Sequence, residues 1–151
     1  MSMFSIAAAG GAGRIAAISA PSSLMRQLHR FAEAVGLSKR GEKAFIASVE
    51  AHVGRPASHF DVRHVAGKVD LPTLVIHDQN DRQVPVAEAA RAAHVLPGAE
   101  LIVTRGLGHN RLLADPAVVE AVIDFVSAHS HSSPVTWGRW PEGSEGEGNN
   151  R

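Results

Sequence analysis

Two short apolar runs, each leading into a polar turn, constrain the fold of this chain more than any other feature. The first run, residues 72–77, leads into an acidic turn that ends at Pro85. The second run, residues 100–104, leads into a turn that contains His109, and an alanine-rich helical pattern separates the two runs. Alternating strands and helices predict a parallel sheet with right-handed crossovers. Both turns are therefore expected at the carboxyl ends of neighbouring strands, where ligands bind in such sheets.

A third apolar run, at residues 15–18, predicts another short buried strand. Between it and residue 71 lie three amphipathic helical patterns, each followed by a glycine. Because three helices are more than a simple crossover needs, residues 22–68 are predicted to form a helical insertion over one end of the sheet. The last helix is predicted to begin at Pro116, with Asp115 as its cap. Its inward face is expected to carry Val118, Val119, Val122, Ile123 and Val126.

Composition narrows the functional classes. The chain has 151 residues, enough for one domain with a real core, and 44% of them are hydrophobic. Its 15 basic and 15 acidic residues balance, so neither a nucleic acid nor an anionic membrane is expected as a partner. There is no cysteine, which excludes disulfides, thiolate nucleophiles and cysteine-ligated zinc. The histidines of the helical insertion lack the spacing of a metal site, and no metal or cofactor is expected.

The two ends of the chain carry weaker signals. Residues 5–9 resemble the end of a helix that is stopped by the glycines at 10–13. The start of the chain lacks the basic segment of a signal peptide, and no run reaches the ~20 apolar residues that span a bilayer. A cytoplasmic protein is therefore expected. Residues 131–151 are rich in Ser, Gly, Glu and Asn and are predicted to be a disordered tail after a domain at 1–130.

Asp81 and His109 are the candidate catalytic pair. A histidine works as a general base only if a carboxylate on its far ring nitrogen fixes the tautomer and stabilises the imidazolium. Each residue follows one of the two neighbouring strands by a few positions, so the two side chains can meet across the strand ends. Taken singly, Asp78 and Asp81 could be turn formers, and His109 could cap a strand end. The order of the pair along the chain favours a paired site.

These segments resemble the α/β-hydrolase family. Asp81 followed by Val84-Pro85 is similar to the family's acid loop, and Gly108-His109 ahead of an Asp-Pro pair is similar to its histidine loop. The resemblance covers residues 5–128 and implies a partial α/β-hydrolase fold, with a three-stranded parallel sheet, flanking helices and a small helical cap. It implies that Asp81, not Asp78, is the triad acid and that His109 is the base. The activity it implies is hydrolysis of an ester, an amide or a similar acyl bond.

The chain departs from the family at the nucleophile. Family members carry Gly-x-Ser-x-Gly on a strand-to-helix turn that precedes the acid loop, and no such sequence occurs here. Ser2 and Ser5 follow no strand, and Ser19, Ser22 and Ser23 follow the wrong one. The chain is therefore expected to be the carboxyl-terminal part of a hydrolase, with Met1 just past the missing turn, and to be inactive alone.

Two functional interpretations remain open. In the first, the chain acts on a small-molecule acyl substrate once the missing half completes it, and the cap shapes the substrate pocket. In the second, it is a non-catalytic relic, a scaffold or a subunit that complements another chain. In either case the strand at 15–18 is expected to leave a sheet edge open for self-association or for the missing half.

Overall fold

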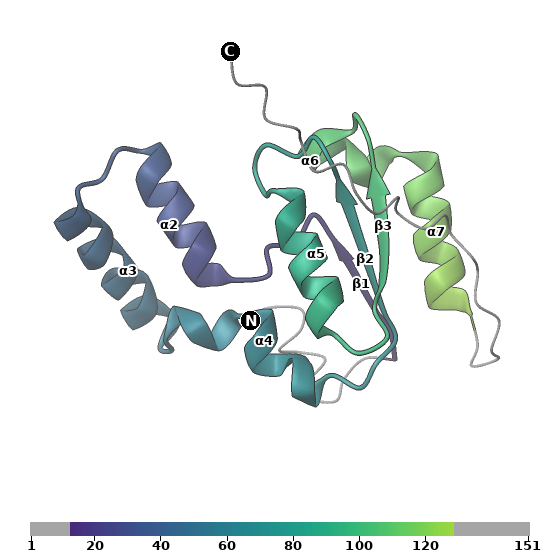
Figure 1. The fold of residues 1–151 in the computed structure, drawn as a ribbon, viewed down its shortest axis with the longest axis horizontal. Coiled ribbons are helices and arrows are strands. Elements are labelled where there is room, and N and C mark those ends of the chain that lie inside the picture. The colour runs from purple at the N-terminus through teal and green to yellow at the C-terminus, as the bar shows by residue number, and fades with distance from the viewer. Residues whose placement is uncertain (1–12, 129–151) are drawn as a thin grey trace, which may run out of the picture.

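A three-stranded parallel sheet forms the centre of the computed structural model, which describes residues 13–128 (Figure 1). The strands are β1 (Ile15–Ile18), β2 (Thr73–Asp78) and β3 (Glu100–Thr104), and they lie side by side in that order. β1 pairs with β2 and β2 pairs with β3, both in parallel. The predicted α/β fold class with a parallel three-stranded sheet is confirmed.

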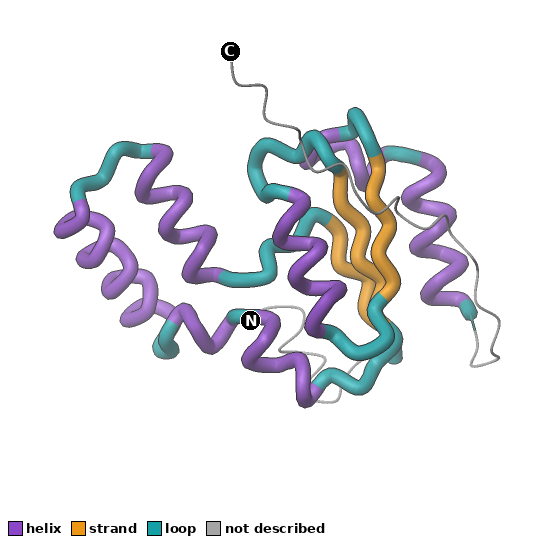
Figure 2. The backbone as a smooth tube through the Cα atoms, in the orientation of Figure 1, coloured by secondary structure: helices purple, strands orange, loops and turns teal. Residues whose placement is uncertain are grey.

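β2 is buried along its whole length because helices cover both faces of the sheet. α5 (Val86–Val95) packs on one face and α7 (Pro116–Ser127) on the other (Figure 2). On the α5 face, Val75 packs with small residues such as Ala89, which let the helix approach the sheet closely. On the α7 face, Ile76 packs with Phe125. This alternation of side chains along β2 is what a strand between two layers requires.

α7 begins where the sequence predicts, but part of its predicted inward face is wrong. The Asp115 carboxylate accepts hydrogen bonds from the first backbone N–H groups of the helix, and Pro116 occupies its first turn. Val118 and Phe125 face the sheet, whereas other apolar residues face outward. These outward residues are Val119, Ile123 and Val126, which are 41%, 54% and 52% exposed. A helix that is apolar on most sides does not reveal by periodicity which side is buried.

The helical block, residues 22–68, contains two long helices and a series of short turns. α2 (Leu24–Ala34) and α3 (Lys39–Val53) are capped by the Ser23 and Ser38 hydroxyls, and Gly54 ends α3 in the left-handed conformation. The short turns that follow are η1 (Ala57–Phe60), α4 (Val62–Val65) and η2 (Ala66–Lys68). The block extends to the α5 side of the sheet (Figure 1), further to the side than its predicted place over the sheet end.

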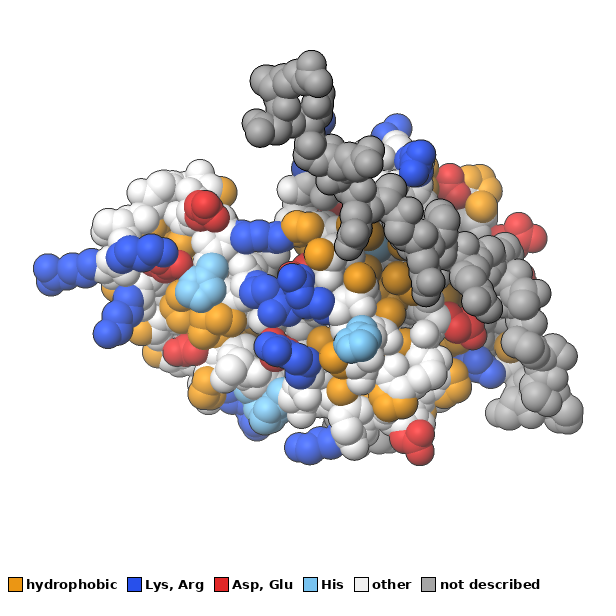
Figure 3. Space-filling view, in the orientation of Figure 1, with side chains coloured by type: hydrophobic (Ala, Val, Ile, Leu, Met, Phe, Trp, Pro, Cys, Tyr) orange, Lys and Arg blue, Asp and Glu red, His pale blue; other side chains and the backbone are white. Residues whose placement is uncertain are grey.

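One buried carboxylate attaches the helical block to α5. Glu88 on α5 accepts hydrogen bonds from the Ser22 hydroxyl at 2.6 Å, from Arg26 Nε at 3.1 Å and from Arg91 at 2.9 Å. Burial alone would raise the pKa of Glu88, but the Ser22 hydroxyl and the Arg26 guanidinium lower it overall. Lys and Arg side chains accordingly gather over the junction of the block with α5 (Figure 3).

Several predictions fall outside this part of the chain. The helix end at residues 5–9 and the tail at 131–151 lie outside the described residues. Within residues 13–128, β1 pairs only with β2, and the use of its outer edge for association stays a prediction. None of the described helices has the length and apolar content that crossing a bilayer requires.

Candidate active site

Asp81 lies in the acid loop, residues 79–85, directly after β2. Its Oδ1 accepts hydrogen bonds from the backbone N–H groups of Gln83 at 2.8 Å and Val84 at 2.9 Å. Burial alone would raise the pKa of Asp81, but the bonds from Val84, His109 and Gln83 lower it below the usual value. The carboxylate is therefore ionised at neutral pH, and Oδ2 remains available to a further donor.

His109 lies in the histidine loop, residues 105–109, and begins the short helix α6 (Gly108–Arg111) with Gly108. Gly106 and Gly108 have φ values of 89° and 65°, which glycine adopts without strain. This path brings His109 Nδ1 to 2.8 Å from Asp81 Oδ2, so that Nδ1–H donates to the carboxylate. The expected contact between the two side chains is present. Asp81 is both a turn former and the partner of His109.

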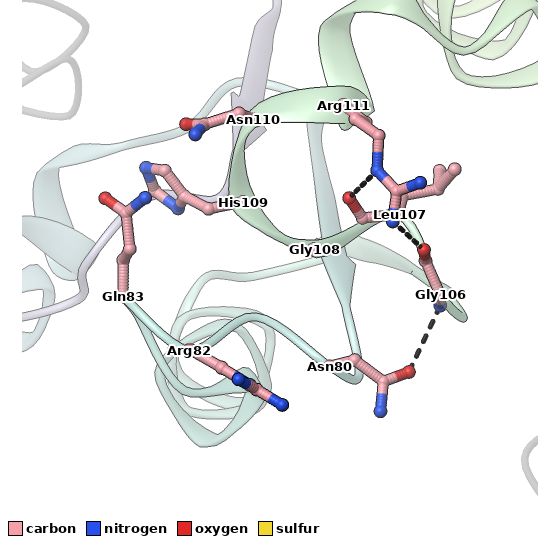
Figure 4. Close-up of a pocket in the computed structure, with 9 residues that line it drawn as sticks. All are labelled: Asn80, Arg82, Gln83, Gly106, Leu107, Gly108, His109, Asn110 and Arg111. Atoms are coloured by element: carbon pink, nitrogen blue, oxygen red, sulfur yellow. Dashed lines mark hydrogen bonds between the residues drawn. The ribbon is translucent and has the colours of Figure 1, made fainter.

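His109 lines a solvent-accessible hollow. The side chain is 27% exposed, and Nε2 has no hydrogen-bond partner among residues 13–128. A hollow of about 450 Å³ lies next to it, and the Gln83 amide points toward the imidazole (Figure 4). A second hollow, of about 500 Å³, lies between α2 and the acid loop. Arg82 and Gln83 line both hollows, and residues of the helical block line only the second one.

His77 is a second imidazole next to Asp81, and it was not among the residues predicted for the site. It is fully buried at the end of β2, and its Nε2 lies 2.8 Å from the backbone oxygen of Val84 and 3.3 Å from Asp81 Oδ2. A carbonyl acceptor requires the proton on Nε2, so His77 donates toward the acid loop. The only feature of the sequence that could have indicated His77 is its place near the end of a buried strand, four residues before Asp81.

Asp78 does not pair with His109. Its Oδ2 accepts hydrogen bonds from the Thr104 hydroxyl at 2.8 Å and from Leu107 N at 3.0 Å, and its Oδ1 accepts one from Asn80 N at 2.9 Å. The bond to Asn80 is a turn-forming one, as the alternative interpretation expected, and the other two reach the neighbouring strand and loop. Burial alone would raise the pKa of Asp78, but these bonds bring it to about 2.

Other candidate groups lie elsewhere. Ser22 bonds to Glu88, Ser23 caps α2, and the hydroxyl of Ser19 is buried, so none of the three bonds to His109. In the part of the chain that the structure describes, no three His, Asp or Glu side chains come together to hold a metal ion.

Comparison with known proteins establishes the family. The profile of the α/β-hydrolase group described as "TAP-like protein" matches residues 25–134, which include both loops of the candidate site. The chain is an α/β-hydrolase family member. Its matches to curated relatives are short. A Pseudomonas savastanoi protein provisionally named carbamate hydrolase RutD is 31% identical over 72 residues, or 47% of this chain and 28% of that protein. Non-heme chloroperoxidase CPO-A1 of Kitasatospora aureofaciens is 44% identical over 43 residues, or 28% and 16%.

Solved α/β-hydrolase structures share the fold over most of this chain. The enzyme MGS-M2, from a Medee basin deep-sea metagenome library, has a TM-score of 0.58 at 15% identity, over 87% of this chain and 63% of its own. Mouse alpha/beta hydrolase domain-containing protein 10 has a TM-score of 0.54 at 20% identity, over 80% and 54%. The enol-lactonase of Burkholderia xenovorans LB400 has 0.53 at 17%, over 83% and 61%. The chain thus spans less than two thirds of each of these relatives.

Proposed function

We propose that this chain carries the acid and the base of a hydrolase that cleaves an ester, an amide or a similar acyl bond. The observation that carries the proposal is the 2.8 Å contact between His109 Nδ1 and Asp81 Oδ2, made by a partly exposed side chain that lines the hollow. A carboxylate in this position keeps the proton on Nδ1, which leaves the lone pair of Nε2 free to accept a proton. Family membership supports the same chemistry.

The reaction then follows from the two side chains. Nε2 of His109 takes the proton of a nucleophilic hydroxyl as that oxygen attacks the acyl carbon, and Asp81 stabilises the imidazolium. The imidazolium returns the proton to the leaving group as the acyl bond breaks, which leaves the acyl group on the nucleophilic oxygen. His109 then takes a proton from a water molecule as the water attacks the acyl carbon, and it returns the proton to the nucleophilic oxygen as the carboxylic acid leaves. The hydroxyl is expected outside residues 13–128, and the chain alone is expected to have no turnover. The helical block lines a second hollow, which shares Arg82 and Gln83 with the hollow next to His109, and would shape the pocket for the substrate.

A fluorophosphonate probe and an activated ester test this proposal. The 151-residue chain is expected to give neither stoichiometric labelling of a serine nor turnover above that of its His109→Ala variant. If a longer form of the protein carries Gly-x-Ser-x-Gly ahead of residue 1, that extended protein is expected to be labelled on the serine of this motif. Stoichiometric labelling in the short chain would contradict its inactivity. Labelling of the extended protein that His109→Ala leaves unchanged would contradict the role of His109.

The second candidate is a non-catalytic scaffold or a subunit that complements another chain. Two features favour it: among residues 13–128 no strand pairs with the outer edge of β1, and Val119, Ile123 and Val126 are exposed on α7. Such surfaces associate with further protein. Size-exclusion chromatography is expected to show a dimer or larger species, and a clean monomer across the micromolar range would count against association.

A further inference from the structure

Three consecutive side chains connect the end of β2 and the start of the acid loop to the end of β3 and the start of the histidine loop. Asp78 Oδ2 accepts from the Thr104 hydroxyl, Gln79 Oε1 accepts from Arg105 Nε at 3.1 Å, and Asn80 Oδ1 accepts from Gly106 N at 3.1 Å. Each acceptor bonds to the residue 26 positions further along the chain. Gln79 and Asn80 are exposed, whereas Asp78 is fully buried and charged. Asp78 therefore makes the strongest of the three connections, because charge-assisted bonds gain in strength away from water.

The carboxylate of Asp78 also reaches the backbone next to His109. Leu107 N, two residues before the imidazole, donates to Asp78 Oδ2 at 3.0 Å, and the nearby Gly108 N–H lowers the pKa of the same carboxylate. The loop between β3 and His109 contains two left-handed glycines, Gly106 and Gly108, which give its backbone little stiffness of its own. An external acceptor for these amides restricts the loop and, through it, the direction of the His109 side chain.

We propose that Asp78 is a positioning residue for His109, whose carboxylate holds the histidine loop so that the imidazole stays on Asp81. The proposal rests on the proposed function in that the positioned group is the base of the reaction. Asp78 itself touches neither His109 nor the hollow next to it; it acts through the Leu107 and Gly108 backbone. A displacement of about 1 Å at a reacting group can cost a factor of ~100 in rate, so such positioning has kinetic consequences.

Asp78→Asn in the 151-residue chain tests the proposal. The variant keeps the shape of the side chain but has one acceptor oxygen in place of two and no charge. Either the bond from Asn80 N or the bonds from Thr104 and Leu107 are lost, and the bonds that remain are weaker. Hydrogen exchange at Leu107 and Gly108 is expected to speed up by a factor of ~10 or more, while the amides of α7 stay unchanged. The imidazole ¹⁵N signals of His109 are expected to shift toward a mixture of tautomers. Gln79→Ala removes the exposed bond to Arg105 and is expected to leave these signals unchanged.

Three outcomes would overturn the proposal: unchanged exchange at Leu107 and Gly108, an equal acceleration in α7, or unchanged His109 signals. If Asp78→Asn fails to fold, Thr104→Val tests the proposal instead, because it removes only one hydrogen-bond donor to Asp78. Hydrogen exchange at Leu107 and Gly108 must then speed up, by a smaller factor than in Asp78→Asn. Asp81→Asn separates this test from the proposed function. If that variant leaves the His109 tautomer unchanged, the acid–base pair fails, whereas the effect of Asp78 on the two amides stands.

In a catalytically active extended protein, the positioning role predicts a particular kinetic pattern. Asp78→Asn is expected to lower kcat by a factor of ~10 to ~100. KM should change little, because the contacts that bind the substrate in its ground state remain. A purely structural role would instead lower the amount of folded enzyme and leave kcat per folded molecule unchanged. Active-site titration with the fluorophosphonate gives the folded fraction, and an unchanged kcat per titrated site would overturn the proposal.

Discussion

The strand-end rim, formed by Asp78, the acid loop and the histidine loop, is attached differently from the helical block at 22–68. In the rim, Asp78 accepts from backbone amides and from a hydroxyl on a neighbouring strand. At the block, Glu88 of α5 accepts from the Ser22 backbone and hydroxyl and from the side chains of Arg26 and Arg91. Backbone donors have no rotamer freedom to lose when they bond, whereas arginine side chains do. The rim should therefore be stiff, and the block should open first.

The helical block also has less of its apolar surface covered. Phe31 on α2 is 52% exposed, although its ring packs against that of Phe45 on α3, with 5.4 Å between the ring centroids. The predicted inward face of α2 is thus only partly buried within the described residues, because the block packs on α5 through few elements. A stiff rim beside a loosely attached block suits a site whose acid and base must be fixed while its pocket adapts to substrate.

The largest expected effect is on the chemistry of the rim. In the extended protein, Asp81→Asn is expected to lower kcat by a factor of ~10⁴, because an amide in this position favours the wrong tautomer of His109. Its Oδ1 can still accept from Gln83 and Val84, so the free energy of unfolding should change little. Steady-state kinetics and urea unfolding measure both quantities. A variant that keeps most of its activity would remove the rim from the catalytic site.

The attachment of the block provides the next largest effect. Glu88→Ala is expected to lower the free energy of unfolding by about 2 kcal/mol, because Ser22 and two arginines lose their buried acceptor. Hydrogen exchange should accelerate in α2 while β2 amides change least. Glu33→Ala, which removes an exposed carboxylate of α2, is the matched control and should change neither quantity. Equal acceleration in β2 and α2 would show that the two regions open together.

Acid pH should test the rim through Asp78. Its pKa of about 2 lies below the unfolded-state value near 4, so its contribution to stability is present above pH ~4 and is lost as the pH falls toward 2. Asp78→Asn has no such group and is expected to show a flatter pH dependence of unfolding between pH 4 and 2. Identical pH profiles for the variant and the wild type would contradict the charged hydrogen bonds assigned to this carboxylate.

The smallest effect should be confined to one helix of the block. Ser38→Ala removes the cap that accepts from Gly41 N at 3.2 Å and is expected to cost about 1 kcal/mol of stability. Ser38→Asp, which restores a capping acceptor, should recover most of the loss. Thermal unfolding by circular dichroism checks both. Activity of the extended protein should be unaffected, and a lower kcat would show that α3 influences the rim.

Local patterns in the sequence determined much of this protein. The strands at 15–18 and 100–104 and the cap at Asp115 lie where they were predicted, and a glycine, Gly54, ends α3. These features depend on hydrogen bonds and apolar contacts between residues a few positions apart, which a linear sequence displays directly. The resemblance of two loops to one family also placed Asp81 opposite His109.

Only the tertiary structure decided how the rim and the block are held. The bonds that Thr104 donates to Asp78 and Ser22 donates to Glu88 join residues 26 and 66 positions apart, and no local pattern marks either pair. The side of α7 that meets the sheet was equally hidden, because apolar residues occupy most of its circumference. Burial and strand order are properties of the assembled layers, and they select among the contacts that a sequence permits.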